Sequence, residues 1–357
     1  MKPAFTQLQH FNGTRRRVLG TGLTAALALA CAPVRAQKTT SIRFQLDWRF
    51  EGPSALFLAA ASKGYFKEEG LDVQIDSGNG SGGAVNRVAS GAYQMGFADI
   101  AALMEFHGNN PSAPNKPVGV MMLYNNTPAT IFALKKSGIK APKDLEGKKL
   151  GSPSFDAGRR GFPIFAQING IDESKVEWIS MEPALRETML VRGDIDAITG
   201  FYFTSLLNIN ARGVPEDDII AMSFPEYGVK LYGNAIIADQ KFAQQNPEAV
   251  KGMLRAITRA SRDVLADPDG HIGLVKARDG IIDEPLELKR LKLCIASSID
   301  TPDAKADGFG DINPERFATM AEQITKVYAT KSPVEAGKIF DRSYLPSAEE
   351  RAGVLRS

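Results

Sequence analysis

Cysteine, histidine and tryptophan are scarce in this chain of 357 residues, which has two, three and two of them. The histidines, His10, His107 and His271, are far apart and lack the spacing of a metal site, and no serine or cysteine pattern is typical of a nucleophilic hydrolase. We therefore expect neither a metal, a cofactor nor a catalytic triad. Beyond residue 36 the only cysteine is Cys294, which excludes an intramolecular disulfide there.

Long apolar runs and basic blocks are also missing after residue 36. No later segment reaches the roughly 18 uninterrupted apolar residues of a membrane helix. The chain has 43 basic and 41 acidic residues, and residues 1–36 contain five of the basic ones and none of the acidic ones. The remaining 38 basic and 41 acidic residues give a net charge near −3. This balance argues against nucleic acid or an anionic membrane as the partner.

The first 36 residues have the order of regions of a twin-arginine signal peptide. Residues 15–17 are three arginines, an apolar run extends from Leu23 to Ala30, and a small-residue site ends at Ala36. We expect cleavage after Ala36 and a soluble protein in the periplasm. Lipidation of Cys31 is the less favoured alternative.

From Ser41 onward, strands alternate with helices. A strand is predicted over 42–46, a helix over 54–63 and a second strand over 71–75, followed by the glycine-rich segment 78–83. This alternation predicts an α/β protein, and some 320 residues suit two domains.

One unit of this pattern occurs twice. A helix ends at Gly91 before a strand over 93–97, and another ends at Gly193 before a strand over 195–199. Two lobes with the same plan would produce this repeat. Open α/β sheets bind ligands beyond the carboxyl ends of their strands, so facing lobes would form a cleft. We expect the connections between lobes near 124–130 and 224–234.

Several segments together resemble one branch of periplasmic solute-binding proteins, which serves importers of nitrate, sulfonates, taurine and thiamine-pyrimidine precursors. The segments are Leu46-Asp47-Trp48, 63–73, 88–91 with 96–99, 144–148, and 193–197. The resemblance implies the type II periplasmic-binding-protein fold, with two α/β lobes, a two-segment hinge and closure around the ligand. It places the first lobe in 38–126 and 230–357 and the second in 127–229.

The resemblance also bears on the ligand. Pyrimidine-binding members follow their Asp-Trp with Pro-Asn and later with His, Gly and Tyr. The corresponding positions here are Phe50, Glu51, Ser54, Leu56 and Phe57. The related yeast enzyme has a cysteine-rich segment and a histidine that have no counterpart in this chain. The resemblance therefore implies binding without catalysis, and a thiamine-pyrimidine ligand is the alternative rather than the first expectation.

Candidate ligand residues follow the first strand. Trp48 and Phe50 could cover a planar ligand, or they could pack in the core. Glu51 could accept a hydrogen bond from a ligand amine or ring N–H, or it could be a solvated turn residue.

A second group follows the next strands. Ser81, Gly82 and Gly83 offer a hydroxyl and free N–H groups to a ligand at a helix start, or serve only as a cap. Asp99 binds a ligand or caps the following helix. The glycines of 78–83 also fit Gly-x-Gly-x-x-Gly, but they follow the second predicted strand, which argues against a dinucleotide site.

The remaining candidates belong to the second lobe and the hinge. They are Asn125, Thr127, Ser154, Phe155, Arg159, Phe201, Tyr202, Tyr227 and Tyr232. Arg159 could hold an anion bidentately or pair with Asp156. The sequence thus predicts a monomeric periplasmic binder that captures a small organic anion or a planar heteroaromatic solute and delivers it to an ABC permease. An exported enzyme on the same fold is a further alternative.

Overall fold

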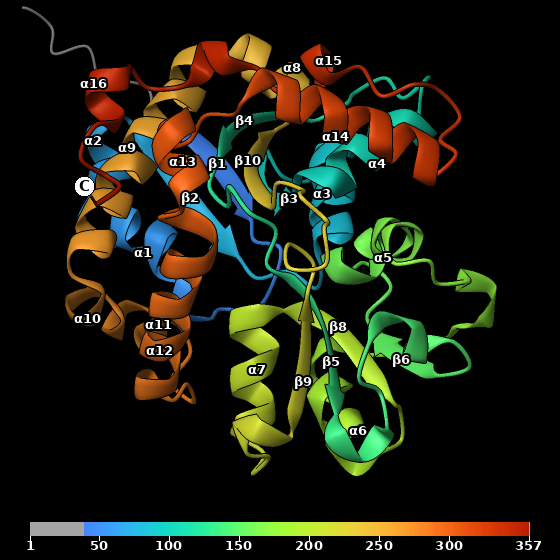
Figure 1. Ribbon diagram of the computed structural model, residues 1–357. Coiled ribbons are helices and arrows are strands. Elements are labelled where there is room, and N and C mark those ends of the chain that lie inside the picture. The colour runs from blue at the N-terminus through green and yellow to red at the C-terminus, as the bar shows by residue number, and fades with distance from the viewer. Residues whose placement is uncertain (1–38, 357) are drawn as a thin grey trace, which may run out of the picture. The chain divides into compact units, whose positions relative to one another are not determined.

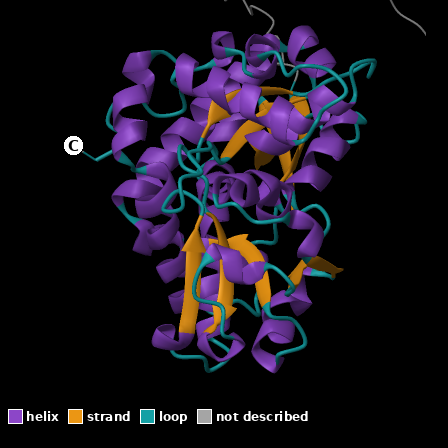
Figure 2. Cartoon of the chain, turned by 45° about the vertical axis from the view of Figure 1, so that its right-hand side comes forward, coloured by secondary structure: helices purple, strands orange, loops and turns teal. Residues whose placement is uncertain are grey.

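The computed structural model describes residues 39–356. The expected leader, residues 1–36, and Cys31 within it lie outside the described residues. The described chain forms two five-stranded sheets with helices around each of them (Figures 1 and 2). Among residues 39–356, none of the helices combines the length and the apolarity of a membrane span.

The first sheet has the strand order β2-β1-β3-β10-β4. Its strands are β1 (Thr40–Gln45), β2 (Leu71–Asp76), β3 (Met95–Asp99), β4 (Val118–Met122) and β10 (Asn234–Ala238). Strand β1 runs parallel to β2 and β3, whereas β10 runs antiparallel to β3 and β4. The strand predicted over 93–97 begins later, at Met95, because the Tyr93 N–H still bonds to the Arg87 carbonyl of the preceding helix.

The second sheet repeats this plan with the order β7-β6-β8-β5-β9. Its strands are β5 (Ala129–Leu134), β6 (Lys149–Ser152), β7 (Glu177–Ser180), β8 (Ala197–Phe201) and β9 (Ile219–Ser223). Again one strand, β6, runs parallel to both neighbours, and another, β5, runs antiparallel to both of its own. The two sheets therefore share one topology, which confirms the predicted fold class of two similar α/β lobes.

The chain passes between the sheets twice, over 123–128 and over 224–233. Three helices accompany the second sheet: α5 (Ala157–Ile168), α6 (Arg186–Arg192) and α7 (Tyr202–Asn210). The others are α1 (Ala55–Ser62), α2 (Tyr65–Glu68), α3 (Ser81–Ala89), α4 (Ile100–Asn109), α8 (Gln240–Gln245), α9 (Pro247–Ala266), α10 (Pro268–His271), α11 (Gly273–Arg278), α12 (Glu284–Cys294), α13 (Pro302–Asp307), α14 (Pro314–Val327), α15 (Ala336–Ile339) and α16 (Ala348–Arg351).

Helix α9 shows how the sequence pattern places an element. Val250, Met253 and Ile257 recur at helical spacing and are fully buried where α9 packs on α1 and β2. Burying each such side chain contributes roughly 1.5–3 kcal/mol. The backbone of Asn246 stands at the N-cap, as predicted, but its side chain donates to the Phe242 carbonyl of α8 and does not cap α9.

Candidate ligand-binding site

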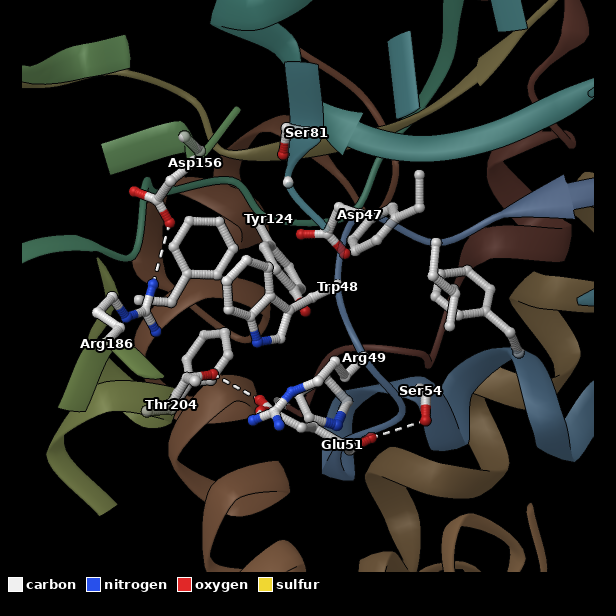
Figure 3. A pocket seen from close by; sticks show the side chains of 18 residues that line it. Asp47, Trp48, Arg49, Glu51, Ser54, Ser81, Tyr124, Asp156, Arg186 and Thr204 are labelled. Atoms are coloured by element: carbon white, nitrogen blue, oxygen red, sulfur yellow. Dashed lines mark hydrogen bonds and ion pairs between the residues drawn. The ribbon is translucent and has the colours of Figure 1, made fainter. Parts of the chain in front are cut away.

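A cavity lies between the two sheets and contains about 580 Å³ free of protein atoms, part of it open to solvent. It is formed by the loop after β1, the starts of α3, α5, α6 and α7, and the first connection between the sheets (Figure 3). The lining residues are Leu46, Asp47, Trp48, Arg49, Glu51, Pro53, Ser54, Phe57, Gly80, Ser81, Phe97, Tyr124, Asp156, Ala157, Arg186, Phe201, Phe203 and Thr204. Both lobes contribute, at the carboxyl ends of strands, as an open α/β sheet predicts.

Aromatic side chains make up much of the wall. Tyr124 lies edge-on to Phe97 at 5.1 Å between ring centroids and to Phe203 at 6.0 Å. Phe201 contacts Phe203 at 5.8 Å. The Arg186 guanidinium carbon is 4.9 Å from the centre of the Trp48 indole. Such a wall suits a planar, largely apolar ligand body.

Three polar atoms in the wall are buried and have no hydrogen-bond partner. They are Trp48 Nε1, Ser81 Oγ and Glu51 Oε1. A buried polar atom without a partner costs about 1–3 kcal/mol, and such atoms in a native cavity usually meet a ligand or water. The cavity therefore offers one N–H donor, one carboxylate acceptor and one hydroxyl to a bound molecule.

Asp47 adds a second acceptor. One of its oxygens accepts from Asn234 Nδ2 at 2.8 Å, and its backbone carbonyl accepts from the Gly80 N–H at 2.6 Å. The carboxyl group is only partly accessible and borders the cavity. Burial raises the pKa of Asp47 to about 7, even though the bond from Asn234 lowers it.

This pKa predicts how stability depends on pH in the ligand-free protein. Because the folded pKa of about 7 lies above the ordinary 3.8, the folded state keeps a proton that the unfolded chain loses between about pH 4 and pH 7. Stability therefore falls as the pH rises through this range. Asp47→Asn keeps the acceptor for Asn234 and should be more stable than wild type by roughly 2–4 kcal/mol at pH 8 but about equal at pH 4.

Urea unfolding at the two pH values measures this difference. The exposed Asp217→Asn is the matched control and should follow wild type at both. Burial also raises the pKa of Asp99 to about 7, and Asp47→Asn removes only the smaller part of that shift, which comes from the charge of Asp47. An Asp47→Asn protein no more stable than wild type at pH 8 would contradict the burial argument.

Arg186 is the centre of a buried network on the second-lobe side. It bonds to Asp156 Oδ2 at 3.1 Å, to Glu187 Oε1 at 2.8 Å and to Ser205 Oγ at 2.9 Å. Asp156 also accepts from Thr199 Oγ1 at 2.9 Å. Two carboxylates thus balance this one guanidinium, and its charge is not free to attract an anion.

The other charges of the cavity wall also disfavour an anionic ligand. Arg49, the other lining cation, is half exposed and stands 3.6 Å from Glu51 Oε1. Against these two guanidinium groups the wall has three acidic side chains, Asp47, Glu51 and Asp156, of which Asp47 is only partly ionised near pH 7. An anion would enter next to an excess of acidic groups. A ligand with N–H donors or positive charge meets complementary groups instead.

Glycines allow the loop between β2 and α3 to lie directly on this site. A Cβ atom on Gly78 would come within 2.1 Å of the Leu46 carbonyl oxygen. Gly80 has a φ of 135°, and its Cβ would come within 2.4 Å of the Phe155 carbonyl oxygen. Close packing between loops therefore explains the glycines that also fit a dinucleotide-binding pattern. Within residues 39–356, no three His, Cys, Asp or Glu side chains are grouped so that they could hold a metal ion.

Comparisons with known proteins identify the family of the chain. The profile described as NMT1/THI5 like matches residues 53–271, more than half of the chain. The chain belongs to the NMT1/THI5-like family. This confirms the resemblance inferred from the sequence.

Relatives of this NMT1/THI5-like protein include an enzyme and a binding protein. It is 29% identical over 241 residues to the 4-amino-5-hydroxymethyl-2-methylpyrimidine phosphate synthase of Aspergillus parasiticus, covering 64% of this chain and 68% of the relative. It is 26% identical over 248 residues to the riboflavin-binding protein RibY of Chloroflexus aurantiacus, covering 69% and 67%.

Among solved structures, the NMT1/THI5-like chain is similar to the alkanesulfonate-binding protein SsuA from Xanthomonas axonopodis pv. citri. The TM-score is 0.65 at 12% identity, over 89% of this chain and 99% of the other. At this identity the likeness shows the fold, that of periplasmic binding proteins, and not the ligand.

Four of the sequence-predicted residues line the cavity of the NMT1/THI5-like protein: Trp48, Glu51, Ser81 and Phe201. Phe50, by contrast, packs beside the core, with Arg278 4.9 Å above its ring. The Gly82 and Gly83 N–H groups donate to the carbonyls of Phe155 and Gly80 and not into the cavity. Asp99 caps α4 by accepting from the Ala101 N–H at 2.8 Å, one of its two predicted roles.

Of the second-lobe candidates, Ser154, Phe155, Arg159 and Tyr202 do not line the cavity. Arg159 donates to Ser180 Oγ at 2.8 Å and stacks on Trp178, and its guanidinium does not pair with Asp156. Ser154 donates to Ser180, Phe155 is partly exposed, and Tyr202 opens α7 without lining the cavity.

The hinge candidates have structural contacts instead. Arg316 donates to Asn125 Oδ1, and Thr127 Oγ1 accepts from the Ala129 N–H. Tyr232 is buried and its hydroxyl donates to Asp307, whereas Tyr227 packs on Phe165. These side chains stabilise the connections between the sheets.

The sequence reasoning missed most of the polar wall. Asp47 lies within the Leu46-Asp47-Trp48 segment, and Asp156 lies among the candidates Ser154, Phe155 and Arg159, so both had a local signal. Arg186 and Thr204 had none, because only the fold brings the starts of α6 and α7 to the cavity.

Proposed function

We propose that this protein is the extracytoplasmic solute-binding component of an ABC importer and that its ligand is a planar nitrogen heteroaromatic. The supporting observation is a wall of aromatic rings with three unpartnered polar atoms: Trp48 Nε1, Glu51 Oε1 and Ser81 Oγ. A heterocycle with both ring nitrogen acceptors and N–H donors would satisfy these atoms while its faces contact the rings. The excess of carboxylates argues against nitrate or a sulfonate.

In this proposal, residues 38–126 and 230–357 form one lobe and residues 127–229 form the other. The two lobes close on the solute, and the monomeric closed form docks on a permease of the inner membrane. The leader of residues 1–36 would export the protein through the twin-arginine pathway. Binding energy shifts the population toward the closed form, and no chemical step is involved.

A thermal-shift panel tests the ligand class. Riboflavin, 4-aminopyrimidine and 4-amino-5-hydroxymethyl-2-methylpyrimidine represent the heteroaromatics, while benzoate, taurine and nitrate represent the anions. A ligand at 100 times its dissociation constant stabilises by about 2.7 kcal/mol, which should raise the melting temperature by several degrees. We expect this rise with at least one heteroaromatic and with none of the anions. Stabilisation by anions alone would refute the ligand class.

The second candidate function is an exported enzyme that acts on a thiamine-pyrimidine precursor. The observation in its favour is the similarity to a pyrimidine phosphate synthase. Incubation of the protein with each stabilising compound, followed by mass spectrometry of the small molecules, separates the two functions. A binding protein returns the compound unchanged, whereas an enzyme releases a product.

A further inference from the structure

The two lobes meet at a buried polar cluster beside the cavity, formed by Glu51, Thr204 and Arg290. Thr204, in the first turn of α7, donates from Oγ1 to Glu51 Oε2 at 2.7 Å (Figure 3). The Nε atom of Arg290, on α12, is 3.6 Å from the same oxygen. Arg290 also donates through Nη1 to the carbonyls of Phe203 and Thr204, at 3.0 and 2.9 Å. Residues of the first lobe are thus hydrogen-bonded to the first turn of α7 in the second lobe.

The first-lobe side of this cluster is rigidly built. Glu287 holds Arg290 with both carboxylate oxygens, at 2.8 and 3.1 Å, and accepts from the Gly52 N–H at 2.6 Å. A Cβ atom on Gly52 would come within 2.2 Å of the Glu287 carbonyl oxygen, so α12 lies directly against the turn that follows Glu51. Arg290 is 1% exposed. These residues are therefore in position to receive α7 when the lobes close.

The two oxygens of Glu51 face different neighbours. Oε2 bonds across the lobes to Thr204, whereas Oε1 is buried in the cavity wall and accepts no hydrogen bond. We propose that Glu51 couples ligand recognition to closure: Oε1 accepts an N–H of the ligand, and that contact orients Oε2 to hold the first turn of α7. This inference rests on the proposed function, because it takes the ligand to be the donor.

One interlobe ion pair lies outside the cavity. Arg160 pairs with Glu105 across the lobes at 2.8 Å, but the pair is partly exposed and neither residue lines the cavity. It can favour closure without sensing the ligand. The pair therefore supplies a control for interlobe contact alone.

The hydrogen bond from Thr204 to Glu51 across the lobes, here called the clamp, is tested first without any ligand. Dyes on Lys67→Cys and Arg192→Cys, two exposed positions in different lobes, report the interlobe distance by single-molecule energy transfer in a full-length Cys31→Ser chain. Cys294 is buried and should remain unlabelled. We expect Thr204→Val to lower the ratio of closed to open molecules about tenfold, as loss of a hydrogen bond to a charged group predicts. Thr204→Ser, which keeps the hydroxyl, should match wild type. Equal distributions for wild type and Thr204→Val would overturn the clamp.

The coupling is tested with 4-amino-5-hydroxymethyl-2-methylpyrimidine and riboflavin as probes. Glu51→Gln should weaken binding about 100-fold, and Thr204→Val should raise the dissociation rate about tenfold without changing which probe binds better. Adding Thr204→Val to Glu51→Gln should then have little further effect, whereas adding Glu105→Gln should have its full separate effect. Additive effects of Glu51→Gln and Thr204→Val would overturn the coupling. If neither probe nor any other heteroaromatic bound wild type, the proposed ligand class would fail, and the ligand-free comparison would still decide the clamp.

Discussion

Replacing Arg186 by methionine should lower the free energy of unfolding by about 3–5 kcal/mol. Arg186 is fully buried and supplies the positive charge next to Asp156 and Glu187, which are also buried. Removing one partner of a buried ion pair leaves an uncompensated charge and costs about this much. Urea unfolding at pH 7 measures the loss.

Two further variants separate the charge effect from a packing effect. Arg159→Met removes a partly exposed guanidinium from the same lobe, and it should cost less than about 1 kcal/mol. The triple variant Arg186→Met, Asp156→Asn, Glu187→Gln has no charge left at the centre of the network and should recover part of the lost stability. A triple variant less stable than Arg186→Met alone would show that packing, and not charge, dominates.

Trp48→Ala should weaken heteroaromatic binding about 30- to 150-fold while the fold remains intact. The indole contributes both a flat face and the unpartnered Nε1 donor to the cavity. Stacking and one hydrogen bond together are worth roughly 2–3 kcal/mol, which corresponds to this loss of affinity. Trp48→Phe keeps the face without the donor and should fall between wild type and Trp48→Ala.

Tryptophan fluorescence measures this loss of affinity, because Trp178 is the only tryptophan of the chain besides Trp48. Trp178 packs edge-on against Phe162 and does not line the cavity. In a Trp178→Phe protein all tryptophan emission comes from Trp48, and titration with a ligand should change it. Affinity in this background should equal that of wild type. A ligand that binds without changing the emission would place the site elsewhere.

Much of the fold could be predicted because it depends on local patterns. The predicted strands over 42–46 and 71–75 correspond to β1 and β2, and the repeated helix-glycine-strand unit anticipated two sheets with one topology. The start of β3 was placed too early because the turn after α3 continues to bond backward to the helix. That bond depends on the helix end and is not visible in residue types.

The candidate site was predictable only where it adjoins a strand end. Trp48, Glu51 and Ser81 follow strands of the first lobe, and the general position of ligands on α/β sheets was enough to find them. Tyr227 and Tyr232 follow strands as well, but they turn inward onto Phe165 and Phe317. An aromatic residue after a strand meets either a ligand or the core, and only three-dimensional packing decides which.

The order of strands has a consequence for the timing of folding during synthesis. Strand β10 lies between β3 and β4, although the whole of the second sheet, residues 129–223, separates it from β4 in the chain. The second sheet needs only contiguous residues, so it can be completed while the ribosome is still making the rest. The first sheet lacks the strand between β3 and β4 until residue 238 has emerged from the ribosome. Asp47 can accept the hydrogen bond from Asn234 only after that. The lobe that is begun first is therefore finished last.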